Sequence, residues 1–383
     1  MGHYELKETL TNEGYVLSEE VHDIVFEQTD LTTKEYSINI DVTNIAPSGE
    51  IHLVKTDKDS EELLSGVIYQ LTAQEDIYSL DGRNTLIYKA GDTVSKDISE
   101  DGYYMTNELG EINIGGLPLG KYQLKEITPL EGYYTDKTEY DIDLSYDHSD
   151  KVIYTKTLNV TNTKSTVEIS KVDATSSKEL AGAHLSLYDK DNNLIEEWIS
   201  TDEPHIIRGL KINEEYRLHE DLAPLGYTTA SDITFTVTDD TATKVTMKDE
   251  ITKIDISKVD ATTSEEIEGA KLTLTDKETG EVIDSWISAK EPHRITGLAV
   301  GKTYILHEEL APQGYLIAND VEFTVLDSGE VQKVVMKDEL APVIVQTGDS
   351  SRVELYAILA VLSLGTAVLY IHLKKKSERE ENE

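Results

Sequence analysis

Short stretches of alternating apolar and polar residues run along most of residues 1–340, a pattern typical of half-buried β-strands. Turn-forming segments rich in Gly, Asn and Asp separate these stretches. Two strand-like stretches occur twice: Val167–Ala174 recurs as Ile254–Ala261, and Trp198–Ser200 recurs as Trp286–Ser288. Short strands in a repeated order predict an all-β fold made of tandem β-sandwiches.

One cassette marks each repeat: a Tyr, a Leu and a Glu at alternate positions, followed by a Gly-Tyr pair. The glutamate follows the first Tyr by four residues and precedes the last Tyr by seven in every copy, and the four glutamates are Glu8, Glu126, Glu220 and Glu308. Strand residues two apart share a face, and the apolar pair marks that face as inward. A carboxylate there is costly to bury unless it is paired or protonated. The alternative is a strand-end glutamate that reaches solvent, but the constant spacing favours the inward position.

The same alternation places a lysine of the opening strand and an Asp or Asn of the closing strand inward in each complete repeat. The three sets are Lys55, Glu126 and Asn162; Lys171, Glu220 and Asp249; and Lys258, Glu308 and Asp338. The copy at Glu8 keeps Asn44 but has no lysine partner. Buried together, such groups must satisfy one another.

Two outcomes are open for these sets. One is a buried charged cluster. The other is a covalent amide, in which burial lowers the pKa of the lysine so that its neutral amine attacks the Asp or Asn side-chain carbonyl. A glutamate kept protonated by the same burial would polarise that carbonyl, and water or ammonia would leave. Proximity in a dry core would supply most of the required geometry.

The repeats predict the organisation of the chain. The predicted segments are the back half of a sandwich at 1–47 that closes with a strand over Ile40–Asn44; a sandwich at 48–164 with an added hairpin or long loop near 76–108; two sandwiches at 165–251 and 252–340; and a stem at 341–352. The short linkers favour a semi-rigid rod. We refer to 48–164, 165–251 and 252–340 as the first, second and third repeats.

The character of the sequence changes after the stem. Leu355–Leu373 contains no Asp, Glu, Lys or Arg and is long enough to cross a bilayer core as a helix. We therefore predict one transmembrane helix at 353–373. Three lysines follow it directly, which predicts a cytoplasmic tail at 374–383 and repeats on the outside.

The composition excludes several classes of partner and of functional site. The 383-residue chain carries a formal net charge of −39, which argues against nucleic acid as a partner. It has no cysteine, which excludes disulfides, cysteine nucleophiles and thiolate metal sites. No metal-ligand spacing or Ser/His/Asp order stands out, so we expect no cofactor, no metal and no enzyme activity beyond a single self-cross-linking event in each repeat.

The Ser-Lys-Val-Asp strand, the Trp-Ile-Ser strand, the cassette ending in Pro-x-Gly-Tyr and the closing Met-x-Asp strand together resemble a known family. They are similar to the Cna B-type (SpaA-like, prealbumin-like) immunoglobulin-fold domains of Gram-positive surface adhesins and pilins. The resemblance covers residues 1–340 and is most specific over 165–340. It implies three intramolecular isopeptide bonds, each assisted by the glutamate of its repeat, which join Lys55 to Asn162, Lys171 to Asp249 and Lys258 to Asp338.

The stem resembles a sortase sorting signal in which Thr347 and Gly348 are the cleaved pair. It departs from the usual Leu-Pro-x-Thr-Gly because Ile344-Val345 stands in place of Leu-Pro. The resemblance implies sortase and peptidoglycan as partners and an extracellular stalk anchored to the cell wall or, through the helix, to the membrane. Two alternatives are a module that binds a host extracellular-matrix protein or glycan through residues 76–108, and a sortase-polymerised pilin subunit. The pilin would need a Tyr-Pro-Lys type motif, which the sequence lacks.

Overall fold

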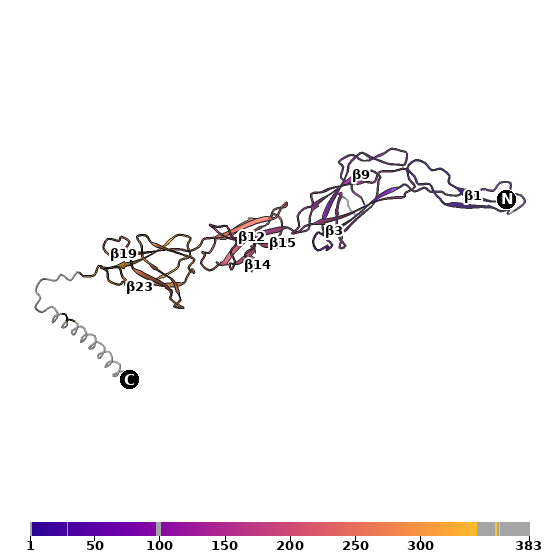
Figure 1. The fold of residues 1–383 in the computed structure, drawn as a ribbon. Helices are drawn as coiled ribbons and strands as arrows, with labels where there is room; N and C mark the ends of the chain where they lie inside the picture. The colour runs from indigo at the N-terminus through magenta and orange to yellow at the C-terminus, as the bar shows by residue number, and fades with distance from the viewer. Residues whose placement is uncertain (1, 29, 97–100, 343–356, 358–359, 361–383) are drawn as a thin grey trace, which may run out of the picture. The chain divides into compact units, whose positions relative to one another are not determined.

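The computed structural model describes residues 2–28, 30–96, 101–342, 357 and 360, and the strands of this part form tandem β-sandwiches (Figure 1). The predicted transmembrane helix at 353–373, the pair Thr347 and Gly348, and the tail at 374–383 lie outside these residues, apart from positions 357 and 360. Over the described positions, no helix is both long and apolar enough to cross a membrane. The all-β fold with prealbumin-like sandwiches is confirmed for the repeats.

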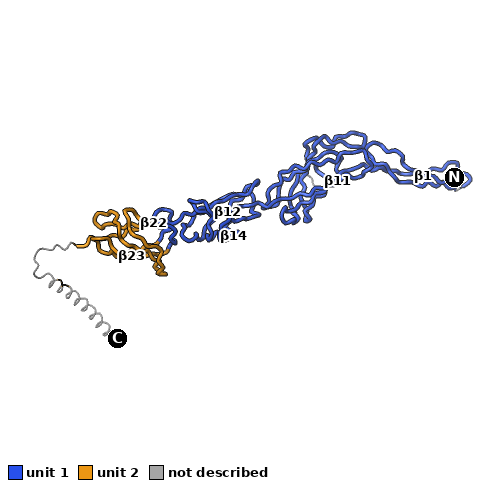
Figure 2. The backbone as a smooth tube through the Cα atoms, in the orientation of Figure 1, with its two compact units in different colours: residues 1–253, 296–301, 325–331 blue, residues 254–295, 302–324, 332–383 orange. Residues whose placement is uncertain are grey.

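The chain divides into two compact units, which Figure 2 colours separately. One contains residues 1–253, 296–301 and 325–331, and the other contains residues 254–295, 302–324 and 332–383. The first and second repeats therefore belong to one unit, and most of the third repeat forms the other.

The second repeat is a sandwich of two sheets. One sheet has the order β15 (His205–Arg208), β12 (Thr166–Asp173), β18 (Thr243–Asp249), and the other has the order β14 (Leu194–Ile199), β13 (His184–Asp189), β16 (Glu215–Leu222), β17 (Ile233–Thr236). The opening strand β12 and the closing strand β18 pair in parallel, with Asp173 opposite Asp249. Buried residues such as Val167, Leu185 and Met247 fill the space between the sheets.

The third repeat has the same arrangement. Its sheets have the orders β22 (His293–Thr296), β19 (Lys253–Asp260), β25 (Gln332–Asp338) and β21 (Val282–Ile287), β20 (Lys271–Asp276), β23 (Thr303–Leu310), β24 (Val321–Thr324). Strands β19 and β25 pair in parallel, with Asp260 opposite Asp338. The repeated motifs of the two stretches thus lie at equivalent places in the fold.

The first repeat keeps both sheets and adds a hairpin. Its sheets have the orders β11 (Ile153–Asn162), β3 (Ser48–Asp57), β8 (Glu111–Leu117) and β10 (Glu139–Asp143), β9 (Lys121–Thr128), β4 (Ile68–Ala73), β7 (Tyr103–Met105); the hairpin is β5 (Ile77–Tyr78) and β6 (Leu86–Tyr88). Strand β7 pairs with β4 as β14 pairs with β13. The segment predicted as an insertion therefore contains a true strand of the sandwich as well as the added hairpin.

The N-terminal segment has only one two-stranded sheet among its described residues, whereas each repeat has two larger sheets. Strands β1 (Gly2–Lys7) and β2 (Val21–Phe26) form an antiparallel pair. The strand predicted over Ile40–Asn44 is wrong, since residues 31–44 contain no strand. A closing strand is held by a parallel opening strand, as β18 is held by β12, and none of the described strands pairs with residues 40–44. Tyr4 is 57% exposed here, whereas the equivalent Tyr216 is 4% exposed.

Candidate functional site

The second repeat brings its three predicted residues together in the core. Lys171 lies on β12, Glu220 on β16 and Asp249 at the end of β18. The Lys171 Nζ atom is 2.7 Å from Glu220 Oε1 and also contacts Asp249 Oδ1. None of the three side chains is more than 1% exposed. The alternation of β12 and β16 puts these polar groups on the same inward faces as their apolar neighbours.

The third repeat repeats this geometry. The Lys258 Nζ atom is 2.9 Å from Glu308 Oε1 and contacts Asp338 Oδ1. All three side chains are again buried. The same arrangement therefore occurs at equivalent places in two repeats.

The first repeat differs in its third member. The Lys55 Nζ atom is 2.8 Å from Glu126 Oε2, and Asn162 Nδ2 donates a hydrogen bond of 2.9 Å to Glu126 Oε1. The glutamate therefore lies between the lysine and the amide. The Asn162 Oδ1 atom is buried without a hydrogen-bond partner. All nine residues predicted for the three sites thus meet in groups of three.

Burial controls the protonation of these groups. It lowers the pKa of Lys55, although the hydrogen bond and negative charge of Glu126 oppose this shift. Burial raises the pKa of Asp249 to about 7, with Lys171 opposing and the charge of Glu220 adding to the rise. Burial also raises the pKa of Asp338. In the second and third repeats, burial therefore favours a proton on the acceptor aspartate.

A backbone N–H fixes each glutamate from the loop after the cassette. Ala230 N donates to Glu220 Oε2 at 2.6 Å, and Ala318 N donates to Glu308 Oε2 at 2.6 Å. In the first repeat, Asp136 N donates to Glu126 Oε1 at 3.1 Å. The donor follows its glutamate by ten residues in each case. Sequence reasoning missed these donors, although their constant offset was a usable signal.

The first repeat has a tyrosine where the others have leucine. Tyr69 is opposite Glu126 in the sheet, whereas Leu185 and Leu272 are opposite the equivalent glutamates. The Tyr69 hydroxyl donates to Glu126 Oε2 at 3.1 Å, and its ring centroid is 5.6 Å from Lys55 Nζ. Burial raises the pKa of Tyr69, so its hydroxyl stays protonated and remains a donor. Tyr69 is thus a fourth residue of this site.

The Tyr69→Phe substitution tests this hydrogen bond. We expect it to destabilise the first repeat by about 1.5 to 3 kcal/mol, because a buried carboxylate loses a donor. The urea midpoint of the first repeat would measure the loss. Tyr78→Phe is the control, because Tyr78 is 40% exposed on the added hairpin. Equal midpoints for the two variants would contradict the role given to the Tyr69 hydroxyl.

The last Tyr of each cassette is tied to the lysine strand. The Tyr315 hydroxyl donates to Asp260 Oδ2 at 2.9 Å, and Asp260 lies two residues after Lys258. Tyr227 makes the equivalent hydrogen bond with Asp173. Tyr133 makes it with Asp57 in the first repeat. This contact gives a structural reason for the fixed distance between the Glu and the last Tyr of the cassette.

The N-terminal segment holds two of the three groups. Asn44 Nδ2 donates to Glu8 Oε1 and Oε2 at 2.8 and 2.9 Å, and Ser18 N donates to Glu8 Oε2 at 2.8 Å. The Ser18 N–H and the Asn44 amide lower the pKa of Glu8. No ion pair between a lysine and Glu8 occurs among the residues with described positions. The segment therefore has no complete site.

The part of the chain that the structure describes contains no group of His, Asp and Glu residues arranged to hold a metal ion. Its buried lysines and glutamates instead lie in three sites within tandem sandwiches whose first and last strands are parallel neighbours.

This combination defines a class of proteins built from tandem prealbumin-like domains. The family model described as the SpaA prealbumin-like fold domain matches residues 49–159, 165–251 and 252–340. The chain therefore belongs to this family. No curated protein matches the chain.

Several solved structures are similar in fold. The Bacillus anthracis TIE protein is 20% identical over 85% of this chain and 55% of its own, with a TM-score of 0.40. The Streptococcal ancillary pilin is 17% identical over 77% of this chain and 100% of its own, with a TM-score of 0.32. The full-length major pilin SpaD from Corynebacterium diphtheriae is 12% identical over 80% of this chain and 99% of its own, with a TM-score of 0.34. This chain thus spans 55% of the TIE protein's length.

Proposed function

We propose that this chain is the stalk of a cell-surface adhesin or pilus, and that a self-formed isopeptide bond stiffens each complete repeat. The observation that carries the proposal is the buried set of lysine, glutamate and Asp or Asn found in all three repeats. Each set lies between the opening and closing strands of its sandwich. A bond there would join the two ends of the repeat.

The chemistry needs only residues of the chain. In the second repeat, the neutral Lys171 amine attacks the side-chain carbonyl carbon of protonated Asp249. A C–N bond forms and a C–O bond breaks, while Glu220 carries a proton from the nitrogen to the departing oxygen, and one water leaves. The third repeat would react in the same way. In the first repeat the leaving group is the Asn162 amide nitrogen, so ammonia leaves instead.

The reaction would consume its own groups, so each site acts once and the chain is a structural protein rather than an enzyme. We further propose the domain boundaries 1–47, 48–164, 165–251 and 252–340, in which 1–47 is half of a sandwich. We also propose extracellular attachment, with Thr347 and Gly348 as the pair that sortase cleaves for transfer to peptidoglycan. The supports are the tandem family match and the charge-free segment at Leu355–Leu373.

The intact mass of the purified chain tests the cross-links. We expect a mass lower than the sequence mass by two waters and one ammonia. Replacing Glu126, Glu220 and Glu308 together by Ala should restore the sequence mass. Glu8→Ala is the matched control and should leave the mass deficit unchanged, because its segment has no lysine partner. A wild-type chain with the full sequence mass would refute the proposal.

A further inference from the structure

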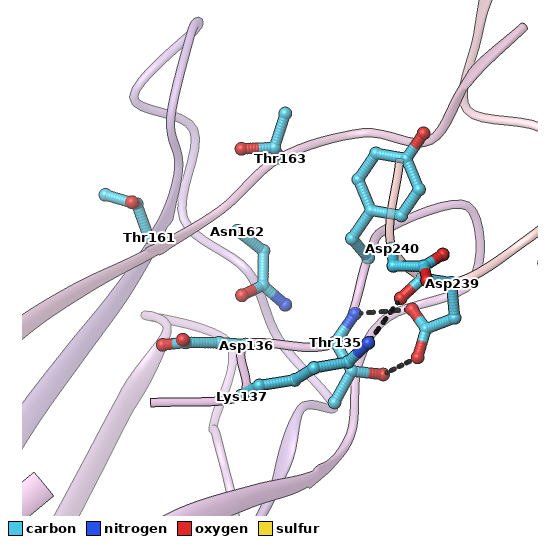
Figure 3. Close-up of a pocket in the computed structure, with 9 residues that line it drawn as sticks. Thr135, Asp136, Lys137, Thr161, Asn162, Thr163, Asp239 and Asp240 are labelled. Carbon is cyan, nitrogen blue, oxygen red and sulfur yellow. Dashed lines mark hydrogen bonds between the residues drawn. The ribbon is translucent and has the colours of Figure 1, made fainter. Parts of the chain in front are cut away.

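A turn of the second repeat holds a loop of the first. Asp239 lies in the turn between β17 and β18. Its carboxylate accepts the Thr135 N–H at 2.9 Å and the Thr135 hydroxyl at 2.8 Å, and its carbonyl oxygen accepts from Lys137 Nζ at 2.9 Å. Figure 3 shows these hydrogen bonds, which converge on the turn from both sides of Asp136. One residue of the second repeat thus accepts hydrogen bonds from two residues of the first, one on each side of Asp136.

The loop that is held belongs to the cross-linking site of the first repeat. The N–H of Asp136, the residue after Thr135, donates to Glu126. Asn162 and Asp239 line the same pocket, as Figure 3 shows. Asn162 is 2% exposed, and its Oδ1 has no hydrogen-bond partner. We call the hydrogen bonds from Thr135 and Lys137 to Asp239 a clamp. The clamp therefore acts one residue away from the Asp136 N–H that binds Glu126, in the pocket that Asn162 also lines.

The same contact recurs at the next junction. Thr229 N donates to Asp327 Oδ1 at 2.9 Å, and the following residue, Ala230, donates its N–H to Glu220. Asp327 lies in the turn between β24 and β25, which is the counterpart of the Asp239 turn. In the third repeat, Ile317 takes the place of the threonine and is 60% exposed. The contact between a turn aspartate and a threonine therefore occurs in the first and second repeats, each of which is followed by another repeat.

Two pairs of glycines bring the repeats close enough for this contact. A Cβ atom on Gly132 would lie 2.5 Å from the Gly209 carbonyl oxygen, and a Cβ on Gly226 would lie 2.6 Å from the Gly297 carbonyl oxygen. Gly132 and Gly226 also have φ values of +81° and +85°, which favour glycine. Both glycines belong to the cassette, so every copy of the cassette carries the residue that this close approach requires.

We propose that Asp239 and Asp327 are positioning residues for the isopeptide bond of the preceding repeat. By holding the loop that orients the glutamate, each couples the cross-linking of one repeat to the folding of the next. Among the residues whose positions are described, the third repeat has no such contact, and we expect it to cross-link without one. This inference rests on the cross-linking chemistry proposed above, because it assigns a role to residues outside the three reacting groups.

The rate of ammonia loss from the first repeat tests the proposal. The full chain would be sampled at intervals after synthesis, and proteolytic fragments of each repeat would be weighed. In Asp239→Ala we expect the Lys55–Asn162 bond to form about five- to thirty-fold more slowly, as expected for the loss of one or two hydrogen bonds. The bonds of the second and third repeats should form at the wild-type rate.

Matched variants separate positioning from a folding defect. Asp240→Ala removes the neighbouring carboxylate of the same pocket and should leave the rate unchanged. Asp239→Asn keeps an oxygen acceptor for the Thr135 N–H and should recover much of the rate. Asp327→Ala should slow the bond of the second repeat and spare that of the third.

Two results would overturn the proposal. One is a wild-type rate in the first repeat of Asp239→Ala. The other is slowing confined to the second repeat's own bond, which would show that the turn matters only to its own domain. A wild-type chain that loses neither water nor ammonia would instead refute the cross-linking chemistry itself.

Discussion

Replacing Glu220 by Ala is expected to lower the free energy of unfolding of the second repeat by about 4.5 kcal/mol. Without the glutamate, Lys171 and Asp249 stay unbonded. Their separation is 78 residues, and closing a loop of that length removes conformational entropy from the unfolded chain. This loss is comparable to the whole stability of a small domain. The substituted repeat should therefore be close to unfolding.

Urea unfolding followed by Trp198 fluorescence measures this effect in a chain that carries Trp286→Phe, since these are the two tryptophans of the sequence. Glu215→Ala is the matched control, because Glu215 is an exposed carboxylate on the same strand β16. The control should keep the wild-type midpoint. An equal midpoint for Glu220→Ala and the wild type would show that no covalent tie stabilises the repeat.

Replacing Lys171 by Met is expected to make the stability of the second repeat fall as the pH rises. The variant cannot cross-link, so Asp249 keeps its carboxyl group. Burial raises the pKa of Asp249 to about 7 even beside Lys171, and removing that cation takes away an effect that opposes the rise. Folded protein then binds a proton that unfolded protein releases near pH 4.

The direction of the pH dependence follows from this difference in proton binding between the folded and unfolded states. The contribution of Asp249 to stability is fully present below pH 4 and is lost as the pH rises to about 7 and above, on the order of 4 kcal/mol in total. Thermal unfolding at a series of pH values would show it. Lys178→Met, which removes an exposed lysine, should follow the wild type, whose Asp249 would be in an amide. A flat profile for Lys171→Met would contradict the raised pKa.

Much of the candidate site could be predicted from the sequence. Strand alternation depends only on backbone geometry, so Lys171, Glu220 and Asp249 could be placed inward without any tertiary information. The repetition of the pattern then fixed which residues belong together. The parallel neighbours β12 and β18 explain why this was enough: the opening and closing strands of each repeat lie side by side.

The remainder depends on contacts that alternation cannot encode. Tyr69 faces Glu126 because of the pairing between β4 and β9, and Asp136 reaches it from an irregular loop. Asp239 acts across a junction between repeats. The strand predicted over Ile40–Asn44 failed for the related reason that an alternating sequence forms a strand only where another strand offers its backbone. Strand β7 was hidden because its three residues are too few to show a period.

The parallel pairing of the opening and closing strands also determines how the chain would respond to a pulling force. The segment from Lys171 to Asp249 spans 78 positions and could add roughly 260 Å of contour length if it were pulled straight. A bond between those residues prevents this extension, and the pulling force is carried instead by the backbone that links one repeat to the next. Lys171 follows Asn162 by nine positions (171−162), and Lys258 follows Asp249 by nine positions (258−249). The loaded backbone between Lys55 and Asp338 would then be two links of equal length, and the chain would be inextensible almost from end to end of its repeats.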